Sequence, residues 1–292
     1  MSKSFLHHIK NYSSLVTFSH TLFAMPFAMI GYFLAATRDG YGFDPKTLVL
    51  VVICMVLARN AAMSFNRFTD RDIDSANPRT RGRDIPAGRI GAKSALTFAI
   101  FNSLLFMLTS WFINTLCFYL SPIALAIVLG YSLMKRFSST SHIILGISLS
   151  LAPIGAYIAV SGHFSFLPLL FSACVVLWVA GFDIIYALQD EEYDRSTKLH
   201  SIPVLIGKKN ALILSSVFHS FCALIVVMAG YFWHFGTLYW IGTGIFSFLL
   251  YTQHRLVKPD DLSKLNLAFF TTNGIASLLF ASFVIADLFF GK

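Results

Sequence analysis

The chain has 292 residues, of which 56% are hydrophobic and only 12% are charged, with a formal net charge of +8. Soluble domains usually have about a quarter of their residues charged, so this composition excludes a water-soluble globule. We therefore predict an all-α integral membrane protein, with a single membrane-embedded domain over residues 1–292.

Apolar runs close to the roughly 20 residues that a helix needs to cross a bilayer recur along the whole chain. We predict nine transmembrane helices, at residues 17–36, 47–68, 94–112, 115–134, 141–160, 166–188, 211–232, 235–253 and 267–290. Only Ile113 and Asn114 separate the third span from the fourth, which predicts a tight antiparallel hairpin.

The basic residues indicate the orientation, because Lys and Arg concentrate in cytoplasmic loops. With a cytoplasmic N-terminus, the inner segments hold most of the basic residues, at Lys3, Lys10 and within 67–93, 135–136, 195–209 and 255–264. The outer side keeps Arg38, Lys46 and Lys292. The positive charge is then a consequence of topology, and no nucleic-acid partner is expected. We expect the inner membrane of a bacterium as the location.

The inner end of the second span carries the first of two acidic clusters. Residues at positions i, i+4 and i+8 of a helix share one face, so Asn66, Asp70 and Asp74 should form a stripe. Asp72 should point the other way. The segment that follows contains Pro and Gly and cannot continue the helix. It supplies Arg79, Arg81, Arg83 and Arg89.

The inner end of the sixth span repeats this arrangement. The second stripe contains Asp183, Tyr186, Asp190 and Asp194. Glu191 and Glu192 fall off the stripe and are expected in solvent. The segments 70–84 and 183–194 together contain nine of the 14 acidic residues of the chain, so the clustering is not random scatter.

Like charges one turn apart repel one another, so a cation should lie between them. Oxygen ligands without His or Cys suit Mg²⁺, which commonly bridges carboxylates to substrate phosphates. The candidate metal ligands are Asn66, Asp70, Asp74, Asp190 and Asp194. Guanidinium groups beside them indicate a phosphorylated ligand. Helix capping and direct pairing of the acids with nearby arginines is the alternative interpretation.

Three further basic residues and a tyrosine belong to the candidate site. Tyr131 and Lys135 lie one turn apart at the inner end of the fourth span, and Lys198 follows the second stripe. Arg59 lies within the second span, where a charge is costly. A substrate carboxylate would account for Arg59, and an ion pair with one of the motif acids is the alternative.

These residues resemble the signatures of the UbiA superfamily of intramembrane aromatic prenyltransferases. The first signature, NxxxDxxxD, is similar to Asn66, Asp70 and Asp74, and its Arg-containing continuation with a Pro-x-Gly turn is similar to residues 83–88. The second signature, DxxxD, is similar to Asp190 and Asp194. A family Arg and a YxxxK pair are matched by Arg59, Tyr131 and Lys135.

The resemblance implies nine helices around a central cavity that opens laterally to lipid and is capped by cytoplasmic loops. Members transfer a prenyl chain from a prenyl diphosphate to an acceptor, with Mg²⁺ as cofactor. The sequence departs from the family pattern at Arg67, where an Asp is often seen, so position 67 supplies no carboxylate ligand.

We therefore expect transfer of a polyprenyl group from polyprenyl diphosphate to a small aromatic acid, 4-hydroxybenzoate, in quinone biosynthesis. Another acceptor, such as a naphthoate, homogentisate or haem, is the alternative, and a membrane transporter is a more distant one. The expected catalytic residues are Asp70, Asp74, Asp190, Asp194 and Lys135. The expected substrate-binding residues are Arg59, Asn66, Arg83, Tyr131, Lys135, Asp183, Tyr186 and Lys198.

Overall fold

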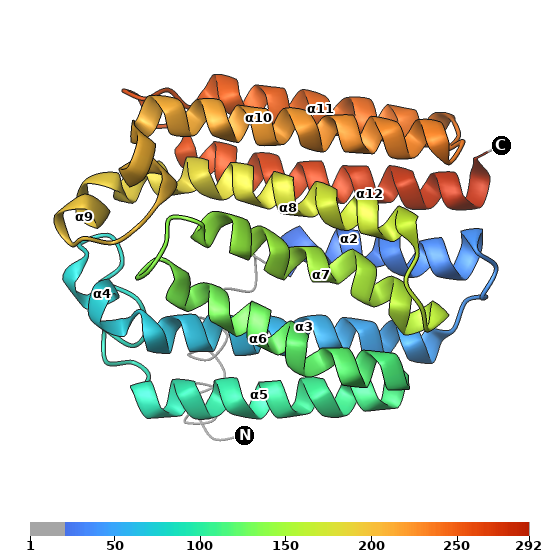
Figure 1. Ribbon diagram of the computed structural model, residues 1–292, viewed down its shortest axis with the longest axis horizontal. Coiled ribbons are helices and arrows are strands. Elements are labelled where there is room, and N and C mark those ends of the chain that lie inside the picture. The colour runs from blue at the N-terminus through green and yellow to red at the C-terminus, as the bar shows by residue number, and fades with distance from the viewer. Residues whose placement is uncertain (1–20, 292) are drawn as a thin grey trace, which may run out of the picture.

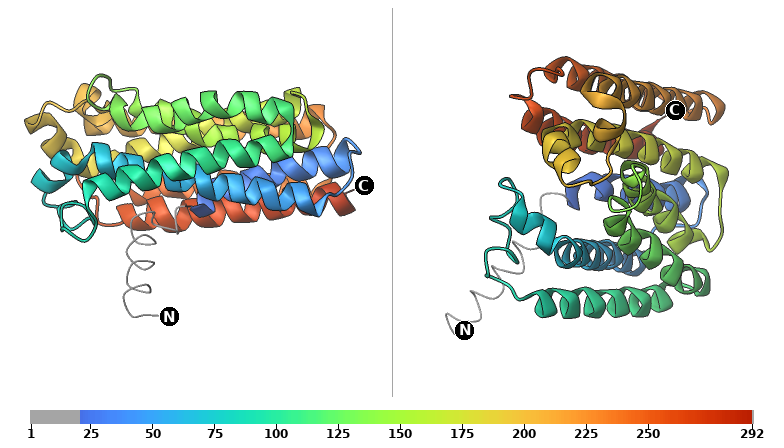
Figure 2. Two further views of the ribbon diagram at one scale, coloured as in Figure 1. Left: turned by 90° about the horizontal axis from the view of Figure 1, so that it is seen from below. Right: turned by 60° about the vertical axis from the view of Figure 1, so that its left-hand side comes forward.

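The computed structural model describes residues 21–291, and over this range the chain is helical, without a β-strand. The helices run along a common axis and form one bundle (Figures 1 and 2). Lys3, Lys10, Lys292 and residues 17–20 of the first predicted span lie outside the described residues. The all-α prediction is confirmed for the described part.

The long helices are α2 (Thr21–Phe33, continued by the π-helical turn η2, Leu34–Arg38), α3 (Pro45–Thr69), α5 (Ala92–Ile113), α6 (Thr115–Met134), α7 (Ser141–Ser161), α8 (Phe166–Ala187), α10 (Ile202–Phe232), α11 (Thr237–Leu256) and α12 (Asn273–Phe290), which follows the π-helical turn η4 (Leu267–Thr272). Three short elements lie together at one end of the bundle (Figure 1). They are α4 (Arg71–Ala76), the 3₁₀ turn η3 (Leu188–Asp190) and α9 (Glu191–Ser196).

Seven of the described helices are long and apolar enough to cross a membrane. The apolar helix Phe23–Arg38 is shorter than a full span within the described residues. Helix α11 has 20 residues, but its aromatic, Gln and His side chains reduce its hydropathy. The structure thus supports seven spans in residues 21–291, and the number nine stays a prediction.

Polar side chains cap the N-terminal ends of α3 and α6. The Asp44 carboxylate accepts hydrogen bonds from the backbone N–H groups of Lys46 and Thr47, and Pro45 begins α3. Asn114 caps α6 by accepting from Cys117 N, and its amide donates to the carbonyl of Ile158 in α7. The predicted hairpin between the third and fourth spans is therefore present, and Asn114 also fastens it to the bundle.

The hydrophobic core lies among α2, α8, α10, α11 and α12. Its largest fully buried side chains are aromatic and include Phe27, Trp178, Tyr239, Phe246 and Phe280. Helix α7 packs directly against α2. The two backbones are so close that a Cβ added at Gly31 would lie 2.0 Å from the carbonyl oxygen of Pro153. This side of α7 therefore has no room for a ligand.

The other side of α7 faces α3 and α6, and here the helices enclose a cavity with a volume of about 300 Å³. Its wall contains small and aliphatic side chains of α3, α5, α6 and α7, with Ala24 of α2. The α7 residues that line it run from Leu145 to Ala159, a helical length of about 20 Å. The cavity therefore extends through much of the apolar thickness of the bundle.

Candidate active site

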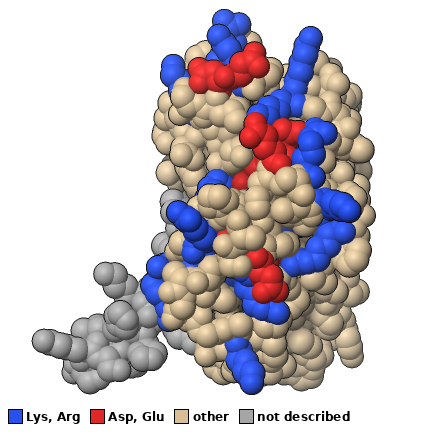
Figure 3. Space-filling model, turned by 90° about the vertical axis from the view of Figure 1, so that its left-hand side faces the viewer, with Lys and Arg blue, Asp and Glu red and all other residues tan. Residues whose placement is uncertain are grey.

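The two acidic segments, far apart in the sequence, meet at the end of the bundle formed by α4 and α9 (Figure 1). The Tyr193 hydroxyl of α9 donates a hydrogen bond to the carbonyl of Ile73 in α4, at 3.0 Å. Figure 3 shows this end of the molecule, where acidic and basic side chains gather on a surface that is otherwise uncharged. The structure thus joins both predicted clusters into one candidate site.

The first acidic stripe keeps a helical register although α3 ends at Thr69. Asp70 N donates to Asn66 O at 2.9 Å and Asp74 N donates to Asp70 O at 2.7 Å, so the i to i−4 pattern continues into α4. Asp70 and Asp74 are each only 2% exposed, whereas the Asp72 side chain is 83% exposed. The predicted facing of these three carboxylates is confirmed.

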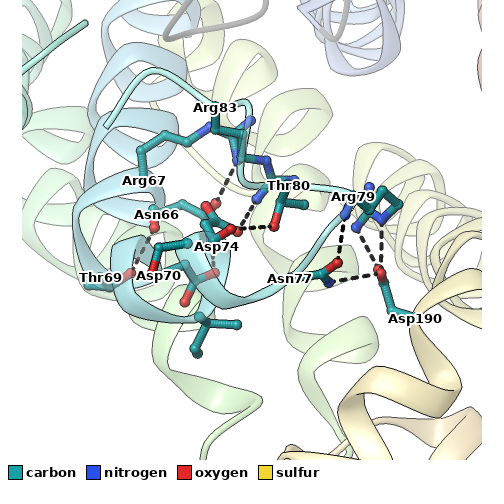
Figure 4. Close-up of polar contacts among 12 residues, drawn as sticks. Asn66, Arg67, Thr69, Asp70, Asp74, Asn77, Arg79, Thr80, Arg83 and Asp190 are labelled. Atoms are coloured by element: carbon teal, nitrogen blue, oxygen red, sulfur yellow. Dashed lines mark hydrogen bonds and ion pairs between the residues drawn. The ribbon is translucent and has the colours of Figure 1, made fainter. Parts of the chain in front are cut away.

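Basic side chains contact these two buried carboxylates, and Figure 4 shows Arg83 beside Asp74. Lys135 Nζ lies 3.1 Å from Asp70 Oδ2, and Arg83 Nη1 donates to Asp74 Oδ1 at 2.7 Å. Arg136 Nη2 lies 3.1 Å from Asp70 Oδ1, a contact that the sequence analysis did not predict. The sequence indicates a role for Arg136 only through its position directly after Lys135.

The second acidic segment is held by the loop that follows α4. Arg79 donates from Nε and Nη2 to the two Asp190 oxygens, at 2.8 and 2.6 Å, and from Nη1 to the Tyr186 hydroxyl at 3.2 Å. The Asn77 amide also donates to Asp190 Oδ1, at 3.3 Å (Figure 4). Tyr186 and Asp190 therefore share a partner, and Arg79 and Asn77 join the candidate site.

The other predicted residues of the second segment have different surroundings. Asp194 interacts electrostatically with Asp190 and Lys135, so it lies at the same site. Asp183 instead contacts His142 Nδ1 at 2.6 Å, and His142 Nε2 faces the backbone N–H of Ile202. This places the proton on Nδ1, where it is donated to Asp183.

Two residues near α9 differ in exposure. Lys198 is exposed, with a backbone φ of 57°. The expectation that Glu191 is solvated is wrong, because it is buried and pairs with Arg195 one turn later.

The apolar cavity reaches this site at the ends of α3 and α6. Arg59 is the charged residue among the described residues that line it, and Tyr131 lines it as well. Arg59 Nε and Nη2 are buried and have no hydrogen-bond partner. Because Tyr131 lies one helical turn before Lys135, which contacts Asp70, the cavity adjoins the first acidic stripe.

The oxygen atoms of the first stripe fit a hard cation. Among residues 21–291, no three His, Cys, Asp or Glu side chains gather into a ready coordination shell. Mg²⁺ does not require one, because it is commonly bound by one or two carboxylates together with substrate phosphates. Asp74 Oδ2 is buried and accepts no hydrogen bond. The Asn66 amide donates from Nδ2 to Asp70 Oδ2 at 3.1 Å, and its Oδ1 accepts from Arg67 Nη1 at 3.5 Å.

Comparison with known proteins identifies the family. A profile of the UbiA prenyltransferase family matches residues 24–283. A 4-hydroxybenzoate octaprenyltransferase of Aliivibrio fischeri (strain MJ11) is 31% identical over 251 residues, 85% of each chain. A protein of the same name from Nitrosomonas europaea is 31% identical over 264 residues, 89% of this chain and 87% of that relative.

Solved structures agree with this result. The apo structure of a UbiA homolog from Aeropyrum pernix K1 has a TM-score of 0.79 and 30% identity, and covers 92% of this chain and 97% of its own. A UbiA homolog from Archaeoglobus fulgidus, bound to GPP and Mg²⁺, has a TM-score of 0.71 at 21% identity, over 95% of this chain and 99% of its own, and supports the fold. With its paired acidic segments and apolar cavity, this chain belongs to the UbiA prenyltransferase family and is an integral membrane prenyltransferase.

Proposed function

We propose that this enzyme transfers a polyprenyl group from a polyprenyl diphosphate to 4-hydroxybenzoate, in a Mg²⁺-dependent step of quinone biosynthesis. The observation that carries the proposal is Arg59, whose buried Nε and Nη2 atoms have no partner in an otherwise uncharged cavity. An aromatic acid would place its ring in the part of the cavity beside Arg59 and satisfy the guanidinium with its carboxylate. The names of the relatives from Aliivibrio fischeri and Nitrosomonas europaea support the same acceptor.

The diphosphate would bind where the two acidic segments meet. We assign the metal-binding role to Asn66, Asp70, Asp74, Asp190 and Asp194, and bound Mg²⁺ would stabilise the negative charge that develops on the leaving diphosphate. The Mg²⁺ and prenyl diphosphates in the Archaeoglobus fulgidus structures support this assignment.

The basic side chains of the site have a second role in this proposal. Lys135, Arg79 and Arg83 pair with the carboxylates in the structure described here. Once those carboxylates bind a cation, the three basic side chains can turn to the diphosphate oxygens. They would still be the positive charges nearest to a diphosphate bound beside the carboxylates.

The apolar cavity would hold the prenyl chain and exclude water. When the bond between the allylic carbon and the diphosphate oxygen breaks, water would quench the resulting cation, so a dry wall is needed. A ring carbon of the acceptor then forms a bond to the allylic carbon, and the ring loses a proton to a site carboxylate or to the departing diphosphate. Tyr131 and Arg59 line the part of the cavity that lies next to the acidic site.

The orientation proposed from the sequence places this site at the cytoplasmic face of a bacterial inner membrane. The end of the bundle that carries α4 and α9 gathers basic residues (Figure 3), as expected for the cytoplasmic side. The full fold would then have nine spans, with the loops around α4 and α9 as a cap and a lateral opening through which the lipid-soluble substrates enter.

The test uses purified protein in detergent with Mg²⁺, labelled octaprenyl diphosphate and a panel of acceptors. The panel contains 4-hydroxybenzoate, its uncharged analogue 4-hydroxybenzamide, a dihydroxynaphthoate, homogentisate and haem. We expect prenylated 4-hydroxybenzoate as the main product, with the amide a poor acceptor. Equal use of the amide, or a preference for another acceptor, would contradict the proposal while leaving the family assignment intact.

A further inference from the structure

The π-helical turn η4, Leu267–Thr272, directly precedes α12 and is fastened by side-chain amides. Asn273 Nδ2 donates to the carbonyls of Ala268 and Phe269, at 3.2 and 2.9 Å. Gln253 Nε2 of α11 donates to the same Ala268 carbonyl at 3.1 Å. π-helical turns are rare and are frequently found at functional sites.

This turn is anchored to the core as well. Trp178 Nε1 of α8 donates to Asn273 Oδ1 at 3.0 Å, and Trp178, Gln253 and Asn273 are all fully buried. In an apolar bundle these polar groups have no water to replace their partners, so the network resists rearrangement. The position of η4 relative to α8 is therefore well defined.

Two aromatic rings of η4 contact Tyr186 at the end of α8. The Phe269 ring is stacked on the Tyr186 ring, with centroids 4.1 Å apart and planes inclined by 28°. The Phe270 ring meets it edge-on at 6.1 Å. Phe269 is 5% exposed, whereas Tyr186 is only partly buried, so the fixed turn restrains the more accessible ring.

Tyr186 in turn contacts Arg79 through both its ring and its hydroxyl. The Arg79 guanidinium carbon lies 5.5 Å from the centre of the Tyr186 ring, and Nη1 donates to the hydroxyl at 3.2 Å. The remaining donors of the same guanidinium bind both Asp190 oxygens. A continuous set of contacts thus leads from the core to a carboxylate of the second acidic segment.

We propose that Phe269 is a positioning residue, which acts through Tyr186 to keep the Arg79 guanidinium beside Asp190, where it can turn to a diphosphate oxygen when Asp190 binds a cation. The inference rests on the proposed function, since it assumes a diphosphate ligand at this site. The Phe269 ring contacts the rings of Phe23, Phe182, Phe270 and Tyr186, and of these Tyr186 is the one that binds Arg79. Phe269 limits the positions that the long, partly exposed Arg79 side chain can adopt before the ligand arrives.

The primary variant is Phe269→Leu, which keeps an apolar side chain and removes the stacked ring. Its control is Phe280→Leu in α12, a fully buried ring that packs on Phe246 in the core and not on Tyr186. Binding of a non-hydrolysable prenyl diphosphate analogue with Mg²⁺ is measured by calorimetry, and the KM values of donor and acceptor are measured separately.

For Phe269→Leu we expect the analogue Kd and the donor KM to rise about two- to tenfold, the range for one lost aromatic contact, with an unchanged acceptor KM. Phe280→Leu should leave the analogue Kd unchanged, even where it lowers thermal stability equally. In a Tyr186→Leu background, Phe269→Leu should have no further effect on the Kd.

An unchanged Kd in Phe269→Leu, or effects of Phe269→Leu and Tyr186→Leu that simply add, would overturn the inference. Should the leucine variant not fold, Phe269→Met provides the same measurement with a more adaptable side chain. Failure of the unmodified protein to bind the analogue would instead reject the proposed function, so the two failures are distinguishable.

Discussion

Replacing Arg59 by methionine separates a substrate-binding role from a structural one. Methionine retains the apolar stem and removes the guanidinium, whose Nε and Nη2 atoms are buried without partners. If an acceptor carboxylate supplies the missing partner, the variant should lose acceptor binding. It should keep its affinity for the prenyl diphosphate, because other cations contact the carboxylates of the acidic stripes. These are Lys135, Arg136, Arg83 and Arg79.

The magnitude follows from the surroundings of the guanidinium. Removing one partner of a buried charge pair costs about 2 to 5 kcal/mol, and the partly accessible Arg59 belongs in the lower half of that range. A loss of about 3 kcal/mol corresponds to about a hundredfold decrease in kcat/KM for 4-hydroxybenzoate. The ligand-free variant should be equally stable or more stable by about 1 kcal/mol, because unpaired buried donors are destabilising.

The assay compares 4-hydroxybenzoate with 4-hydroxybenzamide in the unmodified enzyme, Arg59→Met and Arg59→Lys. The lysine variant keeps the charge but not the planar fork, so it should lie between the other two. Thermal unfolding in detergent without substrates gives the stability. An equal loss toward donor and acceptor, together with lower stability, would refute the reasoning and indicate that Arg59 is a structural residue.

Three further outcomes are expected. Replacing any one of the predicted metal-binding carboxylates by Asn should abolish prenyl transfer and leave the protein in the membrane; these carboxylates are Asp70, Asp74, Asp190 and Asp194. Removing Mg²⁺ with a chelator should have the same effect. Lys135→Ala should raise the donor KM and lower kcat while sparing the acceptor KM, the reverse of the Arg59 variants, as steady-state kinetics would show. Gly31→Ala should destabilise the protein by about 1 to 3 kcal/mol, because its Cβ would overlap Pro153, whereas Gly244→Ala, with open space around it, should leave the unfolding temperature unchanged.

The ends of several helices could be predicted from the residues close to them in the sequence. The predicted ranges 94–112, 115–134 and 141–160 lie within two residues of the ends of α5, α6 and α7, because hydropathy and capping residues such as Asn114 act over a few positions. The predicted span 211–232 did not include the short segment with which α10 begins at Ile202. The range of α10 is broken at Gly207, whose φ of 79° and ψ of 159° are not helical, so Ser201 caps only the short helical segment before this glycine. The longer helical segment starts after Gly207, a few residues before the predicted start at 211.

The spacing of residues along the chain determined which carboxylates share a helix face, and so Asp70 and Asp74 could be paired, and Asp72 set apart, without coordinates. Which cation meets which carboxylate was decided only by the tertiary structure: Arg79 and Asp190 are 111 positions apart, and their contact depends on how the loop after α4 lies against α8 and α9. The same holds for the cavity, which lies on the α3 and α6 side of α7 while aromatic rings fill the other side. Helix periodicity is a property of neighbouring residues, whereas contacts between helices depend on the shapes of side chains from the entire bundle.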